Sequence, residues 1–129
     1  MARPVQESRP VFPMGLLLRG RSALVVGGGR VALQKIRALL AAEATVTVVA
    51  PEIREEIAEL VDQGTLSHLP RRYDGENLQD YAVVFATTDD GEDNARILQD
   101  AKAAGVLCGA GDKNWRDPDF ITPAVHRHG

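Results

Sequence analysis

Three consecutive glycines, Gly27 to Gly29, are the residues of this chain whose spacing points most directly to chemistry. With Arg30, Val31 and Ala32 they form the pattern G-x-G-x-x-A between an apolar run and a stretch of helical periodicity. In such a turn Gly27 permits a tight bend, Gly29 lets a pyrophosphate approach the backbone, and the alanine allows close packing of helix on strand. The helix N-terminus then offers amide donors to the phosphates. We interpret the motif as a dinucleotide-binding turn, and the alternative is a purely structural glycine-rich turn.

The tip of the second predicted strand departs from the usual fingerprint. Dinucleotide-binding domains commonly place an Asp or Glu there to bind the adenosine ribose. Here apolar residues run up to Pro51, and the nearest carboxylate is Glu52. Glu52 either binds a ribose hydroxyl or favours the start of the next helix, and the residues leave both interpretations open. Arg30 and Arg54 lie near this position in the sequence, so NADP remains an alternative to NAD as the cofactor.

A cluster of threonines and aspartates follows the third strong apolar run, at Thr87, Thr88, Asp89 and Asp90. The threonines are candidates for contact with cofactor or substrate. The alternative is a turn followed by a helix cap, which suits the two aspartates at least as well.

Asp112 follows another short apolar run and is a candidate general base beside a bound nicotinamide. Its alternative is a solvated loop aspartate, and Asp117 and Asp119 compete for the role. His126 and His128 are weak metal candidates near the C-terminus, and we predict no metal site. Basic residues in the same loops suit a polyanionic substrate; they are Arg71, Arg72, Lys113, Arg116 and Arg127.

Strands that alternate with helices must position these groups. We predict strands over residues 22–27, 45–50, 65–69, 82–87, 106–108 and 120–122. The predicted helices cover residues 31–42, about 52–64 and 92–104, with Ala95, Leu98 and Ala101 facing inward in the last, and residues 109–119 form a long polar loop. This order predicts an α/β fold, a Rossmann-like parallel sheet with helices on both faces. We expect one domain over residues 12–129 after a flexible tail, 1–11.

Composition narrows the classes of function. The net charge of −3 does not favour a nucleic-acid partner. No apolar run approaches the roughly 20 residues that span a bilayer, and residues 1–10 lack a secretory pattern. The single cysteine, Cys108, is predicted to be a buried strand residue rather than a nucleophile. These features indicate a cytoplasmic enzyme or binding domain without a membrane partner.

The motifs taken together resemble the precorrin-2 dehydrogenase family, which includes the N-terminal part of sirohaem synthase and the bifunctional dehydrogenase–ferrochelatases. The resemblance runs from about Phe12 to the C-terminus, and no one motif carries it alone. It rests on residues 25–32, Lys35, residues 46–51, residues 85–90, Asn94, Asp112 and residues 120–124.

The resemblance implies NAD-dependent oxidation of precorrin-2, a tetrapyrrole, to sirohydrochlorin, with ferrochelatase activity left open for the complete protein. It makes Asp112 the catalytic aspartate, which helps to remove a proton while hydride leaves for NAD⁺. The full set of predicted cofactor contacts is Gly27, Gly28, Gly29, Arg30, Val31, Pro51, Glu52 and Thr87. The alternatives are an NAD(H)-binding sensor and an assembly module, both without catalysis.

Some residues depart from the family pattern. Gly109, Ala110 and Gly111 stand where relatives usually have an asparagine and two valines before the aspartate, and the loop after Asp112 is one residue longer than usual. Glu43 replaces a common glycine. The chain stops at Gly129, before the dimerisation segment and helical domain of the family, so a homodimer stays open for the complete protein. We therefore expect cofactor binding to survive better than catalysis.

Overall fold

The computed structural model describes residues 10–111. Within this range five strands alternate with three α-helices, as the sequence predicted. The strands are β1 (Ser22–Val26), β2 (Thr45–Val49), β3 (Ser67–Leu69), β4 (Val83–Ala86) and β5 (Leu107–Ala110). The helices are α1 (Arg30–Ala41), α2 (Glu55–Asp62) and α3 (Gly91–Ala104), with a 3-10 turn, η2 (Leu78–Asp80), before β4.

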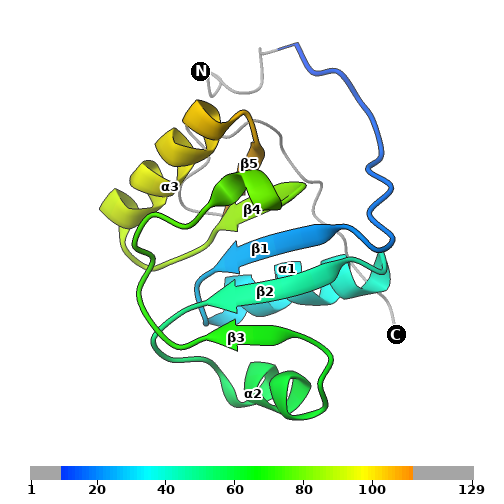
Figure 1. Cartoon of the computed structure of the whole chain (residues 1–129), viewed down its shortest axis with the longest axis vertical. Coiled ribbons are helices and arrows are strands. Elements are labelled where there is room, and N and C mark those ends of the chain that lie inside the picture. Colours follow the sequence, from blue (N-terminus) through cyan, green and yellow to red (C-terminus); the bar gives the residue numbers. More distant parts are fainter. Residues whose placement is uncertain (1–9, 112–129) are drawn as a thin grey trace, which may run out of the picture.

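The described strands form one parallel sheet in the order β3-β2-β1-β4-β5 (Figure 1). The chain moves outward from β1 through β2 to β3 and then crosses back to pair β4 with the other side of β1. The strand order therefore reverses between β1 and β4. In open parallel sheets this switch point opens a crevice at the carboxyl ends of the strands, where ligands bind. The loops after β1 and β4 flank this switch point.

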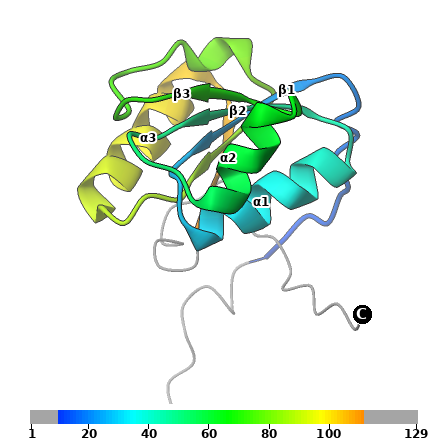
Figure 2. The same cartoon turned by 90° about the horizontal axis from the view of Figure 1, so that it is seen from below.

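Helices cover both faces of the sheet, which can be followed in Figures 1 and 2. Alternate residues of each strand point to opposite faces. In β1, Ala23 and Val25 join the core under α1 and α2, whereas Leu24 and Val26 join the core under α3. Because both faces are buried, β1 reads as a continuous apolar run and not as an alternating one. The predicted Rossmann-like α/β class is confirmed.

The strands are up to two residues shorter at several ends than predicted, and three larger differences have a clear physical cause. Helix α2 begins at Glu55, not near Glu52, because residues 51–54 pack against the glycine turn instead. Strand β5 extends to Ala110, into the predicted loop, because its pairing with β4 continues through Ala86. Ala95 is exposed, since Asn94, Ile97 and their partners form the buried side of α3. The predicted strand over residues 120–122 lies outside the described residues.

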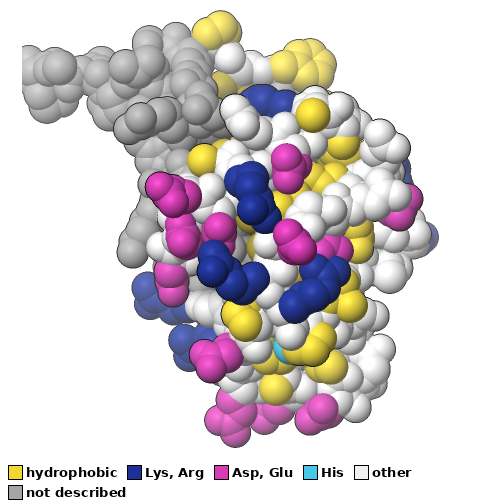
Figure 3. Space-filling view, turned by 60° about the vertical axis from the view of Figure 1, so that its left-hand side comes forward, with side chains coloured by type: hydrophobic (Ala, Val, Ile, Leu, Met, Phe, Trp, Pro, Cys, Tyr) yellow, Lys and Arg dark blue, Asp and Glu magenta, His cyan; other side chains and the backbone are white. Residues whose placement is uncertain are grey.

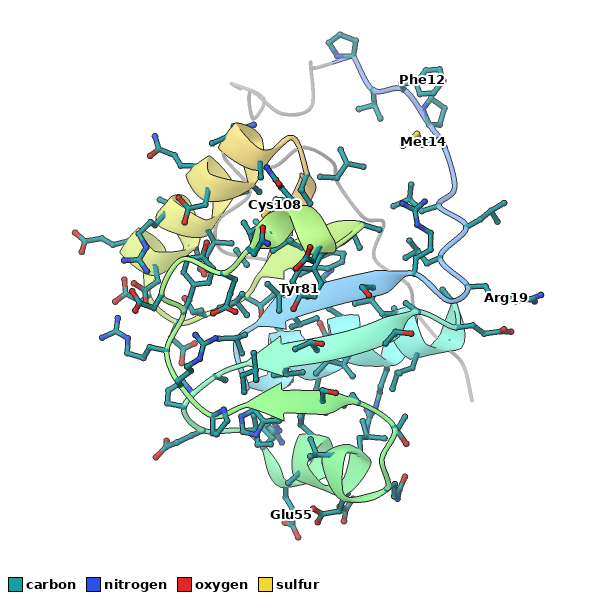
Figure 4. The ribbon with its side chains drawn as sticks, viewed as in Figure 1. Phe12, Met14, Arg19, Glu55, Tyr81 and Cys108 are labelled. Carbon is teal, nitrogen blue, oxygen red and sulfur yellow. The ribbon has the colours of Figure 1, made fainter. Side chains whose placement is uncertain are left out.

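Residues 10–17 precede the first strand without a helix or strand of their own. Phe12 is 84% exposed and Met14 is 62% exposed, and both stand on this extended segment away from the sheet (Figure 4). Among the helices between residues 10 and 111, none combines the length and apolar character that a membrane crossing requires.

Candidate dinucleotide site at the carboxyl edge of the sheet

The glycine turn joins β1 to α1 at the switch point. Gly27 has φ 134°, a conformation that residues with a Cβ rarely adopt, and its amide donates to the Val49 carbonyl at 2.9 Å. A Cβ on Gly27 would lie 2.6 Å from Thr87 Oγ1, so the turn also needs glycine for space. The predicted roles of Gly27 and of Ala32, which is fully buried against the sheet, agree with this geometry.

Gly29 precedes α1 as its N-cap and is exposed. A Cβ built on it would meet nothing within 4 Å. The α1 N-terminus has no side-chain cap and no acidic residue in its first turn. A helix N-terminus without a side-chain cap is the kind of place that receives an anionic group.

The N-terminus of α3 shows the opposite arrangement. The Asp90 carboxylate accepts hydrogen bonds from the amides of Glu92 at 2.9 Å and Asp93 at 3.2 Å. The interpretation of Asp90 as a helix cap is thus confirmed. The two helices leave the same edge of the sheet, but a side chain caps α3 and none caps α1.

Residues 51–54 form the other side of the glycine turn. The Arg54 amide donates to the Gly28 carbonyl at 2.9 Å, and a Cβ on Gly28 would overlap the Glu52 carbonyl oxygen. Pro51 and Glu52 are exposed on this loop. Helix α2 begins three residues after Glu52, so Glu52 precedes the helix and is not part of its first turn. The structure therefore brings Pro51 and Glu52 to the turn, as the cofactor prediction requires.

Thr87 lies at the end of β4 and is buried. Its hydroxyl and its amide both donate to the Val26 carbonyl, each at 2.9 Å. Thr87 therefore fixes the ends of β1 and β4 to each other directly below the turn. The amide of Gly111 continues this edge by donating to Ala86 O at 3.1 Å, and a Cβ on Gly111 would lie 3.1 Å from a methyl of Val31.

These contacts place the end of β5 beside the first turn of α1. Arg30, the first residue of α1, is exposed there, and Val31 is half-buried. Asp112 comes directly after Gly111 in the sequence but lies outside the described residues, as do Asp117 and Asp119.

Asn94 is a buried polar residue of this edge to which the sequence analysis gave no role. Its amide nitrogen donates to the Thr88 carbonyl at 2.9 Å, and its Oδ1 accepts from the Thr88 amide at 3.0 Å. The pair fixes the loop after β4 against α3. The available signal was an asparagine on the apolar face of a predicted helix, where a polar side chain needs a partner.

Two of the arginines that suggested a polyanionic substrate already pair with carboxylates of this chain. Arg71 pairs with Glu76, and Arg72 lies 2.8 Å from the Asp93 carboxylate. The hydrogen bonds that the two guanidinium groups donate to these carboxylates raise the pKa of both arginines. Figure 3 shows basic and acidic side chains interspersed on the face seen from the carboxyl edge. Among the described loops, then, this surface is mixed and not basic.

Arg54, one of the two residues that left NADP open, also has a partner. Its Nε lies 3.3 Å from Glu56, whose pKa is lowered by its own backbone amide and by Arg54. Both side chains are close to half exposed, so this pair is weak. Cys108 is fully buried in β5, as predicted. Within residues 10–111 no group of three His, Cys, Asp or Glu residues is placed to hold a metal.

The chain is similar to siroheme synthases and to a precorrin-2 dehydrogenase. A siroheme synthase of Chromobacterium violaceum is 45% identical over 114 residues, which are 88% of this chain and 24% of that protein. Siroheme synthase 2 of Aeromonas salmonicida is 42% identical over 88% of this chain and 23% of its own length. The solved structure of SirC, a precorrin-2 dehydrogenase, superposes with a TM-score of 0.75 at 29% identity, covering 92% of this chain and 58% of SirC.

These similarities confirm the resemblance drawn from the motifs, and the chain spans about a quarter of the length of the curated relatives. A model of the putative NAD(P)-binding family matches residues 15–124. Because this match includes all five described strands and most of the sequence, we conclude that the chain belongs to the putative NAD(P)-binding family.

Proposed function

We propose that this chain is the NAD-binding domain of a precorrin-2 dehydrogenase that acts in the cytoplasm. The observation that carries the proposal is the N-terminus of α1, uncapped and open over Gly29 at the switch point of the sheet. An anionic pyrophosphate fits this place because amide donors and the helix dipole favour negative charge there. The similarity to SirC supports a tetrapyrrole substrate.

Each predicted cofactor residue has a role in this proposal. The amides after Gly29, with Arg30 and Val31, hold the pyrophosphate, and Gly27 and Gly28 permit the close approach of loop and turn. Pro51 and Glu52 contact the adenosine ribose. The Glu52 carboxylate suits NAD, whose ribose has a free hydroxyl, better than NADP, whose ribose carries a phosphate. Thr87 supports the turn from below, through its hydrogen bonds to Val26.

The chemistry requires a hydride acceptor and a base. NAD⁺ supplies the hydride acceptor when it is bound. Asp112 takes the proton that leaves the macrocycle, so that precorrin-2 loses one hydride and one proton to become sirohydrochlorin. Its position in the sequence, directly after Gly111, supports this role because Gly111 lies beside Val31 in the first turn of α1.

Calorimetric titration with NAD⁺ and a turnover assay with precorrin-2 test the proposal. Gly29→Asp places a carboxylate where the pyrophosphate would lie, so we expect it to abolish NAD⁺ binding while the protein stays folded. Asp112→Ala should keep NAD⁺ affinity and lose turnover in a protein that has the remaining family domains. NAD⁺ affinity unchanged by Gly29→Asp would refute the assignment of the turn. Binding of NAD⁺ without turnover by the longer protein would favour a sensor.

A further inference from the structure

The pairing between β2 and β3 stops abruptly at the loop that carries Pro51 and Glu52. The Ala50 amide still donates to the Leu69 carbonyl at 3.2 Å, which continues the ladder by one bond. In a parallel ladder the Arg71 amide would next donate to Ala50 O. Instead the Arg71 amide turns back to Leu69 O at 2.9 Å, after Pro70, which has no amide hydrogen. The ladder thus leaves the Ala50 carbonyl without its backbone donor.

A side chain of β3 replaces that donor. His68 Nε2 lies 2.8 Å from Ala50 O, so the ring donates its N–H to this carbonyl. Ala50 is only 3% exposed, and a buried carbonyl without a partner would cost about 1–3 kcal/mol. The His68 ring is itself half-buried, which limits its freedom to leave the bond.

The bond from His68 holds one end of a short loop whose other end is also held. At residue 54 the Arg54 amide donates to Gly28 O at 2.9 Å. Between these two points lie Pro51 and Glu52, the exposed residues that we assign to the adenosine ribose. The loop is therefore fixed to β3 at its start and to the glycine turn at its end. A loop fixed before binding loses less conformational entropy when the ligand arrives.

We propose that His68 is a positioning residue for the adenosine half of the dinucleotide. It acts through the Ala50 carbonyl, by holding residues 50–54 in the conformation that meets the ribose. This inference rests on the proposed function, because it presumes that NAD binds along this edge. His68 itself touches the backbone of the chain and is assigned no contact with the cofactor.

Binding measurements on variants of the full chain test this role. His68→Phe keeps a ring of similar size but has no donor, and we expect the Kd for NAD⁺ and for ADP-ribose to rise about five-fold or more. His68→Gln keeps an N–H at a similar reach and should restore both Kd values to within about two-fold. If His68→Phe does not fold, His68→Asn serves in its place, because its shorter amide does not reach Ala50 O.

Tyr73→Phe is the matched control for stability. It also removes one hydrogen bond, from a loop that follows β3, but Tyr73 bonds Asp100 of α3 and not residues 50–54. We expect it to lower stability without changing either Kd. The proposal fails if His68→Phe binds both ligands like the wild type, or if Tyr73→Phe weakens binding equally. If the wild-type chain itself binds neither ligand, the cofactor assignment fails first and the positioning role fails with it.

Discussion

Gly28 and Gly29 are neighbours in the sequence, yet their surroundings in the fold are opposite. A side chain at Gly28 would enter the backbone of the loop at Glu52, whereas a side chain at Gly29 would enter open space. The first glycine is therefore required by the protein's own packing. The second is open because, in our proposal, a ligand lies there.

Gly28→Ala should destabilise the fold. The new methyl group overlaps a backbone carbonyl that is itself held by neighbouring bonds, so the loop and the turn must move apart. Overpacking of this kind costs about 1–3 kcal/mol. Urea unfolding, followed by circular dichroism, measures the loss. An unchanged free energy of unfolding would show that residues 51–54 move away freely.

Gly29→Ala is the matched variant at the adjacent position. Its backbone, at φ −99° and ψ −157°, is accessible to alanine, and the methyl meets nothing within 4 Å. We expect the free energy of unfolding to stay within about 0.5 kcal/mol of wild type. The Kd for NAD⁺ should nevertheless rise about ten-fold or more, because the methyl occupies the place of the pyrophosphate. Wild-type affinity would move the pyrophosphate elsewhere.

The sequence predicted the place of this turn between a strand and a helix but missed its surroundings, for a physical reason. The roles of Gly27, Gly29 and Ala32 follow from spacing within one turn, between a strand and a helix. The need for glycine at Gly28 depends on Glu52, which belongs to the next loop along the sheet. The roles of His68 and Asn94 likewise depend on partners brought together only by strand pairing or by helix docking. The order of residues within one segment carries no information about contacts between segments.

At the scale of elements, the connection from α1 to β2 contains a strained residue. Glu43 has φ 65°, in the left-handed region, and is the only residue besides glycine in the described range with a positive φ. Its amide donates to Leu40 O at 2.9 Å, closing the last turn of α1. Glycine adopts this conformation at a helix C-terminus without the cost of a Cβ, which gives a physical reason for the glycine expected here from the family resemblance. The sequence showed that Glu43 replaces an expected glycine, but only the backbone angle shows that this replacement strains the chain.

Glu43→Gly should stabilise the chain. A left-handed conformation costs a residue with a Cβ about 1–2 kcal/mol, and glycine avoids this cost. Part of the gain is lost, because glycine also has more conformational freedom in the unfolded state. The variant also loses the ion pair between Glu43 and Arg19, which spans 2.8 Å but is largely exposed and worth little. We expect a net gain of about 0.5–1 kcal/mol in urea unfolding.

Arg19→Ala is the control for this prediction, because it removes the same ion pair and leaves the backbone angle as it is. We expect it to change the free energy of unfolding by less than about 0.5 kcal/mol. A loss of stability in Glu43→Gly matched by an equal loss in Arg19→Ala would mean that the ion pair, and not the backbone, dominates at this corner.

At the scale of the whole molecule, the segment from β3 to η2 ties the edge of the sheet to the layer formed by α3. Arg96 donates to the Tyr73 carbonyl at 2.9 Å and lies over the Tyr73 ring. The Tyr73 hydroxyl donates to the Asp100 carboxylate at 2.6 Å. Arg72 adds its pair with Asp93. All four contacts reach α3 through ionisable side chains, so the link between the layers depends on protonation.

Alkaline pH should therefore weaken the molecule through Tyr73. Burial and the bond to Asp100 raise the pKa of the Tyr73 hydroxyl well above its ordinary value of about 10. The folded state thus holds this proton more tightly than the unfolded state does. The stabilisation is complete below about pH 10 and is lost as the pH rises above that value, because there the unfolded chain releases the proton first.

Comparison of wild type with Tyr73→Phe in urea, at about pH 8 and about pH 11, measures this dependence. At the lower pH the variant should be less stable by about 1 kcal/mol, the usual contribution of one hydrogen bond. Between the two pH values its stability should fall less than that of wild type, since phenylalanine has no proton to release. Equal alkaline losses in both proteins would show that other groups control the link. In that case the polar contacts between Tyr73 and α3 would not explain how the crossing segment is held.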